Sequence, residues 1–97
     1  MNLMNLQNSL ENQDREYNIK ASLIVAMDRL RVEPFDIHNM YLDIESEYKR
    51  VSTNEIQNAI RNGSIGKYGS TYKFNTQSVC IWINQYLENK NKRNLGI

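Results

Sequence analysis

Cysteine, proline and histidine each occur only once among the 97 residues of this chain. A single cysteine excludes an intrachain disulfide, and a lone thiol suits a reducing compartment. Glycine is also sparse, with four residues, while 40% of the chain is hydrophobic and 24% is charged. This is the composition of an ordinary globular domain, and it argues against a chain that is disordered throughout.

Long apolar runs are missing as well. No stretch approaches the roughly 18 apolar residues that a membrane span needs. The first residues, MNLMNLQNSLENQD, lack the basic region and the continuous apolar region of a secretory signal. A chain of this length has room for one domain with one modest core. The sequence therefore predicts a single cytoplasmic domain with no membrane partner.

The charges are unevenly distributed along the chain, although the net charge is only +1. Residues 1–50 contain six Lys or Arg against nine Asp or Glu, whereas residues 51–97 contain six against two. The basic second half is what an anionic partner would select. Attraction between the two halves within one fold explains the same asymmetry, and both interpretations stay open.

Residues 15–31 and 37–48 repeat apolar residues every three or four positions, which predicts two amphipathic helices. The first helix is expected to follow an N-cap at Asp14, and the second an N-cap at Asp36, with Pro34 breaking the pattern between them. The predicted buried stripes are Ile19, Leu23, Met27 and Leu30 on the first helix, and Ile37, Met40, Tyr41, Ile44 and Tyr48 on the second.

Residues 52–62 predict a third, short helix that buries Ile56, Ala59 and Ile60. Ser52 and Glu55 have the spacing of a capping box, and Asn62-Gly63 is expected to end the helix. Almost no connector separates this helix from the one before it. The two helices are therefore expected to turn sharply on one another, as in a helix-turn-helix unit.

The segment 65–74 fits two forms. It reads as a small, wing-like hairpin with Gly69-Ser70 as a two-residue turn, or as a loop that lays its aromatic side chains over the core. A last helix follows, capped by Asn75 or Thr76, with a buried stripe of Val79, Trp82, Ile83 and Tyr86.

The predicted architecture is thus mostly α. It is a compact four-helix domain with a helix-turn-helix-like unit and at most one short β-hairpin before the last helix. Residues 1–13 are expected to form an N-terminal arm or a weak amphipathic helix, residues 14–89 the helical domain, and residues 90–97 a basic tail that frays.

Catalytic and metal-binding patterns are poorly represented. His38 has no second histidine and no cysteine near it in sequence, and no His/Cys cluster has the spacing of a metal site. Cys80 lies within an apolar run and is expected to pack as a small hydrophobe. No glycine-rich phosphate-binding motif is present. The sequence therefore predicts a protein that is not an enzyme and that uses no cofactor or metal.

Polar side chains dominate the face of the predicted 52–62 helix that lies opposite its buried residues. They are Asn54, Gln57, Asn58 and Arg61. Asn and Gln can pair with adenine, and Arg with guanine, in a DNA major groove. In the hairpin form Lys67 and Lys73 would reach phosphates as a wing does, and Lys90, Lys92 and Arg93 would add salt-dependent contacts. DNA binding is the first hypothesis; the competing explanation is that an Asn-rich chain shows asparagine on any exposed face.

Protein binding is the alternative hypothesis. Leu3, Leu6 and Leu10 recur at helical spacing on an otherwise polar segment. Such a stripe would gain free energy by docking into a partner's groove, or by forming a homodimer contact. The chain would then be an adaptor, or an inhibitor of a host or replication protein.

One motif carries a family resemblance. The pattern Gly66-x-Tyr68-Gly69-x-x-Tyr72-x-x-Asn75, followed by Trp82 and Tyr86, resembles one found in small uncharacterised proteins of phages and mobile elements of gut bacteria. It covers about the last third of the chain. The resemblance implies a mobile-element accessory protein in the cytoplasm of a bacterial host, related to replication or transcription. It implies no activity, and it assigns no functional residue.

Overall fold

The computed structural model describes residues 3–71 and 73–94, and the side chains of residues 13–71 and 73–93. Four helices make up this part of the chain: α1 (Leu3–Leu30), α2 (His38–Glu47), α3 (Thr53–Ser64) and α4 (Thr76–Asn94). No strand occurs in the described residues. The prediction of a four-helix domain is therefore confirmed, and the domain is all-α.

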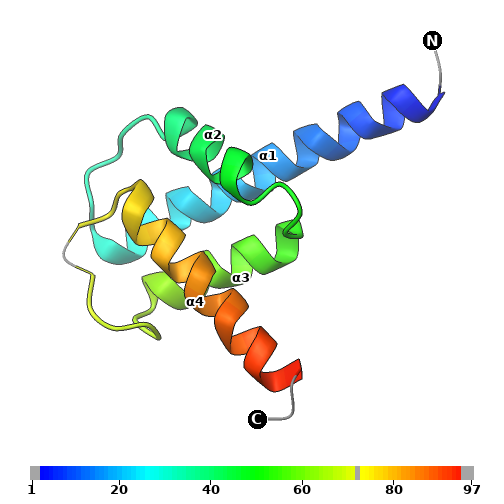
Figure 1. Ribbon diagram of the computed structural model, residues 1–97. Helices are drawn as coiled ribbons and strands as arrows, with labels where there is room; N and C mark the ends of the chain where they lie inside the picture. Colours follow the sequence, from blue (N-terminus) through cyan, green and yellow to red (C-terminus); the bar gives the residue numbers. More distant parts are fainter. Residues whose placement is uncertain (1–2, 72, 95–97) are drawn as a thin grey trace.

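The helices are arranged around α1 and α4. In Figure 1, α2 and α3 lie on opposite sides of α1, and α4 crosses in front. Helix α1 packs against α2 and α3, and α4 packs against the same two helices. The N-terminal half of α1 extends well beyond the other helices (Figure 1). None of the helices described is both long enough and apolar enough to cross a membrane.

A single hydrophobic core joins the four helices. The stripes predicted for the first three helices are buried, except that Leu30 is half-buried at the edge of the core. Val79, Trp82 and Ile83 are also buried, whereas Tyr86 and Cys80 are only partly covered. Burial of a side chain the size of Ile60 contributes about 1.5–3 kcal/mol, so these stripes define the fold.

The predicted start of the first helix is wrong. Asp14 is not an N-cap but an exposed residue inside α1, which begins at Leu3. No glycine or proline interrupts residues 3–30, so nothing in the chain stops the helix at Asp14. The helix ends at Leu30, and the next residue, Arg31, has a left-handed φ of 56°. The bonds Arg31 N to Asp28 O and Val32 N to Met27 O close the last turn in a Schellman arrangement.

Short-range caps set the start of α2 and α4. Oδ1 of Asp36 accepts a hydrogen bond from the backbone N–H of His38 at 2.9 Å, although Ile37 occupies the N-cap position itself. Oδ1 of Asn75 accepts one from the backbone N–H of Ser78 at 2.9 Å, which selects Asn75 as the cap of α4. Helix α4 continues to Asn94, so the beginning of the expected basic tail is helical.

The predicted end of α3 is also wrong. Gly63 lies inside the helix and is buried, because its missing side chain leaves room for the Trp82 ring. The left-handed residue that ends α3 is Gly66, with a φ of 88°. Its N–H donates to Gly63 O, and the N–H of Lys67 donates to Asn62 O, which repeats the arrangement that closes α1.

The segment after α3 is a loop, and the hairpin form is not found among its described residues, 65–71 and 73–74. Gly66 and Gly69 both have positive φ, and Gly69 N–H donates back to Gly66 O. Phe74 is buried with its ring centroid 6.0 Å from that of Trp82. Phe74 thus anchors the end of this segment on the core. Tyr72 lies outside the described residues.

Candidate nucleic-acid interface

Helix α3 carries the candidate interface and starts at a well-defined cap. Ser52 is extended, with φ −65° and ψ 154°, and its Oγ accepts the N–H of Glu55 at 3.2 Å. Only this half of the predicted capping box is formed. The Glu55 carboxylate instead binds Nζ of Lys90 on α4. This ion pair raises the pKa of Lys90, and it ties the beginning of α3 to the far end of α4.

The exposed side of α3 is a polar ridge formed by Asn54, Asn58 and Arg61, spaced by four and three residues. Ile56, Ala59 and Ile60 fill the opposite side and are completely buried. Because these buried residues fix the rotation of α3 about its axis, the ridge residues are held on the side that faces solvent. No acidic residue belongs to it.

Gln57 departs from the prediction. Its side chain turns towards α1, where Nε2 donates to the backbone oxygen of Asn18 and to Oγ of Ser22, both at 3.2 Å. An amide held in this way joins two helices and is not free to read a base. Position 57 lies roughly 100° from Asn58 around the helix, at the boundary with α1. The sequence could not show which boundary position would meet a neighbour.

A groove between α1 and α3 borders the ridge on one side. It encloses about 390 Å³ and is lined by Ala21, Ser22, Val25, Arg29, Gln57, Asn58 and Arg61. Nη1 of Arg29 donates to Oγ of Ser64 at 2.9 Å, and this hydroxyl donates to Arg61 O at 2.9 Å. Arg29 was not identified from the sequence, because its closeness to α3 depends on how α1 and α3 pack.

A second groove borders the ridge on its other side, between α4 and the start of the loop. It encloses about 590 Å³ and is lined by Asn62, Lys67, Tyr68, Tyr86, Asn89, Lys92 and Arg93. Nδ2 of Asn62 donates to the Tyr68 hydroxyl at 3.2 Å, which fixes the ring over the groove. The lining contains three cations and no acid. Nζ of Lys92 also forms an ion pair with Oε1 of the exposed Glu88, at a distance of 3.4 Å.

The two loop lysines do not come together. Lys67 lines the groove beside α3, as described above. Lys73 lines a different hollow, with Ser78, Ile81 and Trp82 at the beginning of α4. The structure thus places Asn54, Asn58 and Arg61 along the exposed side of α3, with Lys67 just beyond the C-terminal end of this helix, and leaves Lys73 apart.

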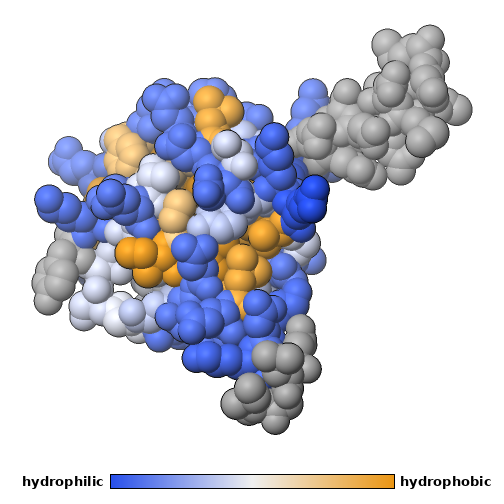
Figure 2. Space-filling model, viewed as in Figure 1, coloured by the Kyte–Doolittle hydropathy of each residue, from blue (hydrophilic) through white to orange (hydrophobic). Residues whose placement is uncertain are grey.

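Exposed acids gather on and just before α2. Asp36, Asp43 and Glu47 are exposed on or just before α2, which lies across α1 from α3 (Figure 1). On the face shown in Figure 2, hydrophilic side chains cover the C-terminal half of α4, and apolar patches lie over the middle of the domain. The exposed acids of α2 and the cations that line the groove beside α4 therefore belong to different elements of the domain.

The side chains of His38 and Cys80 lie against other residues of the domain. Nδ1 of His38 lies 2.9 Å from Nζ of Lys20. Burial raises the pKa of the Cys80 thiol, which disfavours the reactive thiolate. No group of three His, Cys, Asp or Glu side chains in the described residues could hold a metal ion.

The leucines of the proposed protein-binding stripe belong to α1. The backbone of Leu3, Leu6 and Leu10 is helical, but their side chains lie outside the described part of the structure. Comparison with protein-family models, curated proteins and solved structures found no significant match to the chain.

Proposed function

We propose that this chain is a non-enzymatic DNA-binding module in which α3 enters the major groove. Helices α2 and α3 follow one another through a short turn, as in a helix-turn-helix unit, but they do not pack together, and α1 and α4 hold α3 in position instead. The observation that carries this proposal is the acid-free ridge of Asn54, Asn58 and Arg61, flanked on both sides by grooves with cationic side chains. A B-DNA major groove is wide enough for one helix, and phosphates line both of its edges.

The ridge would supply sequence readout. The amides of Asn54 and Asn58 can each form two hydrogen bonds with adenine, and the Arg61 guanidinium can do so with guanine. All three side chains are exposed and project from a helix whose position is fixed by the core. Gln57 has no such role in this proposal, because α1 holds its amide.

The flanks would supply the phosphate contacts. Arg29 lies on the α1 side, and Lys67, Lys92 and Arg93 lie on the α4 side. Four such contacts would make the affinity strongly dependent on salt, since each one releases condensed counterions. The loop would take the place of a wing through Lys67 alone. The resemblance of residues 66–86 to phage and mobile-element proteins supports an accessory role in replication or transcription.

The test is a fluorescence anisotropy titration of mixed-sequence duplex DNA at several salt concentrations. The wild-type chain is expected to bind, with an affinity that falls steeply as salt rises. The double variant Arg61→Glu/Lys67→Glu is expected to abolish binding. The matched control is Arg31→Glu/Lys73→Glu, which changes the charge equally at exposed positions away from the ridge. Absence of binding by the wild type at low salt would refute the proposal.

A protein-binding role is the second proposal, and one specific observation favours it. Tyr17, Ile24 and Val25 are exposed on α1, on the side away from the core. Apolar side chains grouped in this way mark a surface that is covered by another protein. The oligomeric state of the chain distinguishes an adaptor, which needs a foreign partner, from a protein that covers this surface with a second copy of itself.

A further inference from the structure

Helix α1 has two apolar faces on opposite sides. One is the core face, where Ile19 and Leu23 are completely buried. On the other, Tyr17 is 73% exposed, Ile24 is 55% exposed and Val25 is 44% exposed. The core does not need this second face. Exposure of these apolar side chains to water is unfavourable, and a partner that covers them would remove this unfavourable free energy.

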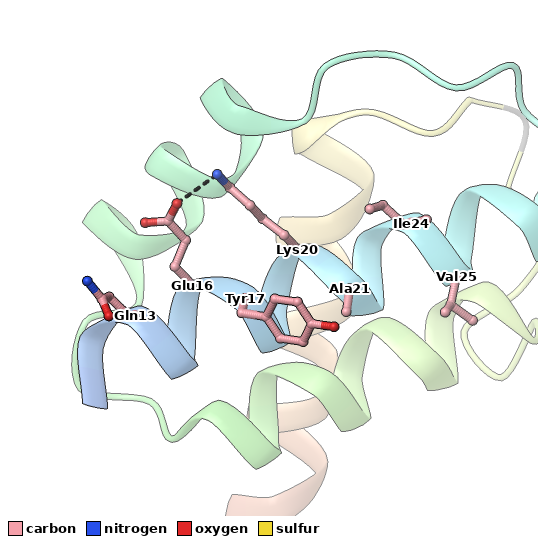
Figure 3. A pocket seen from close by; sticks show the side chains of 7 residues that line it. All are labelled: Gln13, Glu16, Tyr17, Lys20, Ala21, Ile24 and Val25. Atoms are coloured by element: carbon pink, nitrogen blue, oxygen red, sulfur yellow. Dashed lines mark hydrogen bonds and ion pairs between the residues drawn. The ribbon is translucent and has the colours of Figure 1, made fainter. Parts of the chain in front are cut away.

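The second face is hollowed in the middle. A depression of about 690 Å³ is lined by Gln13, Glu16, Tyr17, Lys20, Ala21, Ile24 and Val25. Figure 3 shows the small side chain of Ala21 between the Tyr17 ring and the branched side chains of Ile24 and Val25. A small residue between larger ones forms a hole, into which a side chain of a packed helix inserts as a knob.

The helical register continues this face into the projecting half of α1. At 100° per residue, positions 3, 6 and 10 fall on the same side of the helix as positions 17, 21 and 24. All three positions are leucines. The face therefore has two parts: leucines on the half that extends beyond the domain, and a hole on the half that belongs to it.

The spacing of this face reads the same in both directions. From Leu3 to Ile24 the steps are 3, 4, 7, 4 and 3 residues. Two such helices in antiparallel orientation, related by a two-fold axis between Gln13 and Asp14, would bring Leu6 of one copy opposite Ala21 of the other. Leu3 would face Ile24, and Leu10 would face Tyr17. Each leucine is thus matched to a position on the domain, and Leu6 is matched to the hole.

We infer that the chain forms an antiparallel homodimer through this face of α1. In this arrangement the projecting half of each α1 packs on the domain of the other copy. Two identical contacts then form about one axis, as in a closed two-fold dimer. The paired length from Leu3 to Ile24 is about 32 Å at 1.5 Å per residue, a full helix–helix seam. A second copy fits better than a foreign protein, because the chain itself supplies both the leucines and the hole.

The first experiment measures the oligomeric state by sedimentation equilibrium over micromolar concentrations. The wild type is expected to be a dimer, and Ile24→Asp is expected to weaken it by about tenfold or more. The matched control is Ile81→Asp, an isoleucine that is 62% exposed on α4 and should leave the dimer unchanged. A wild-type chain that stays monomeric, or equal effects of the two variants, would overturn the inference.

The second experiment tests the orientation by cross-linking in a Cys80→Ser background. Gln13→Cys is expected to form a disulfide-linked dimer on mild oxidation, because the two copies of position 13 flank the axis. Leu3→Cys should not, since its two copies lie about 32 Å apart. Cross-linking through position 3 would establish a parallel pair and overturn the inference, whether or not position 13 also cross-links, because only a parallel pair brings the two copies of position 3 together. Neither experiment uses DNA, so the outcome is independent of the proposed function.

Discussion

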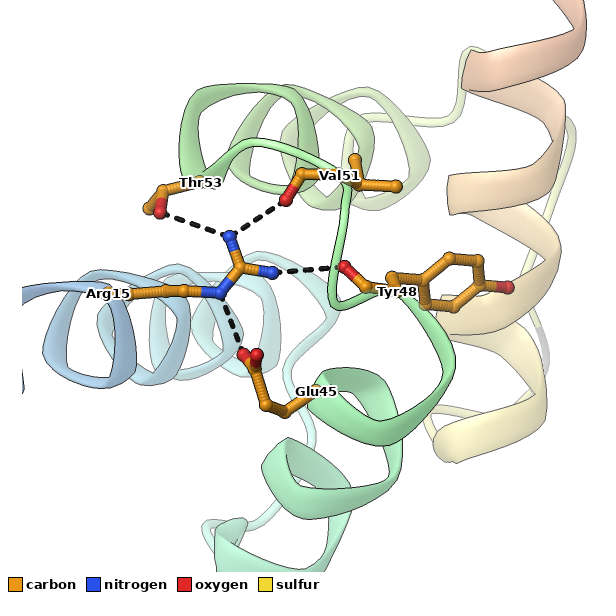
Figure 4. Close-up of polar contacts among 5 residues, drawn as sticks. All are labelled: Arg15, Glu45, Tyr48, Val51 and Thr53. Atoms are coloured by element: carbon orange, nitrogen blue, oxygen red, sulfur yellow. Dashed lines mark hydrogen bonds and ion pairs between the residues drawn. The ribbon is translucent and has the colours of Figure 1, made fainter. Parts of the chain in front are cut away.

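Nε of Arg15 donates a hydrogen bond of 2.7 Å to Oε2 of Glu45, and the same guanidinium reaches the turn between α2 and α3 (Figure 4). Nη1 donates to Val51 O at 2.7 Å, and Nη2 donates to Tyr48 O at 3.0 Å. A single side chain of α1 thus binds both α2 and the backbone that leads into α3. This contact fixes the start of the helix that carries the proposed DNA-reading ridge.

Arg15→Lys is expected to lower the free energy of unfolding by about 2 kcal/mol. The planar guanidinium donates to one carboxylate and two backbone carbonyls at once, and the compact ammonium group of lysine cannot reach all three acceptors from one position. Urea denaturation followed by circular dichroism measures the change. The matched control is Arg50→Lys, at an exposed position of the same turn, with an expected change within about 0.5 kcal/mol. Equal effects of the two substitutions would show that the Arg15 contacts contribute little.

Gly63→Ala is expected to destabilise the domain even though alanine favours a helix. A β-carbon at this position would overlap the ring of Trp82, which is itself buried. The gain in helix propensity is about 1 kcal/mol, while forcing atoms into a packed core costs about 1–3 kcal/mol or more. Because the overlap is with rigid ring atoms, we expect a net loss of about 2 kcal/mol.

The measurement is chemical denaturation followed by Trp82 fluorescence, which also reports a displaced ring. The control is Gly66→Ala, where a β-carbon would meet nothing within 4 Å and only the positive φ of 88° opposes the change. That strain costs about 1 kcal/mol. A Gly63→Ala variant as stable as the wild type would mean that α3 and α4 are less closely packed than described.

The stability of the domain is expected to fall at alkaline pH through Tyr48. Burial raises the pKa of Tyr48 to about 12 from its ordinary value of 10.0, and its hydroxyl donates to Oδ1 of Asn84 at 2.7 Å. Because the folded state holds the proton more tightly than the unfolded state, this stabilisation is complete below pH 10 and is lost as the pH rises through about 12. The free energy of unfolding should fall in this window, on the order of 2 kcal/mol.

Tyr48→Phe makes the decline shallower and isolates the contribution of this hydroxyl. The decline does not vanish, since burial also raises the pKa of Tyr41 and acts in the same direction. Free energies of unfolding measured at a series of alkaline pH values would test this. A variant with the same pH dependence as the wild type would contradict the role of Tyr48.

The sequence predicts the helices and the core well, because both depend on periodicity within one segment. The stripes from Ile19 to Ile83 are buried as their spacing requires, apart from Leu30 at the edge of the core. Predictions based on a single local signal fail where a stronger tertiary interaction competes. Gly63 looks like a helix stop, but the Trp82 ring makes it an interior residue, and Gly66 ends the helix in its place.

The candidate site shows the same division. Asn54, Asn58 and Arg61 are exposed as predicted, since the opposite face of α3 is strongly apolar. The attachment of Gln57 to α1, the separation of Lys73 from Lys67 and the nearness of Arg29 to Ser64 all depend on how helices distant in sequence pack together. No local pattern in the chain encodes those distances.

The ion pair between Glu55 and Lys90 leads to a prediction with opposite effects on stability and on DNA binding. The Glu55 carboxylate lies in the first turn of α3, where it interacts favourably with the helix dipole and forms an ion pair with Lys90 of α4. It is also the acid nearest in sequence to the proposed DNA-reading ridge. Lys90 has an ordinary pKa of 10.5, so it stays protonated at neutral pH when its partner is removed. Glu55→Gln should therefore lower the free energy of unfolding by about 0.5–1 kcal/mol.

The same substitution should tighten DNA binding about threefold at low salt, because it releases one cation and removes one repulsive charge beside the phosphates. The slope of the logarithm of the affinity against the logarithm of the salt concentration should become steeper, by up to the amount that one additional phosphate contact contributes. Anisotropy titrations of Glu55→Gln and of the control Glu47→Gln, which removes an exposed acid from α2, would separate this local effect from a change in net charge. If both variants bind equally, DNA responds only to the total charge of the domain. If Glu55→Gln binds more weakly than the wild type, the acid-free ridge of α3 is not the DNA-binding surface.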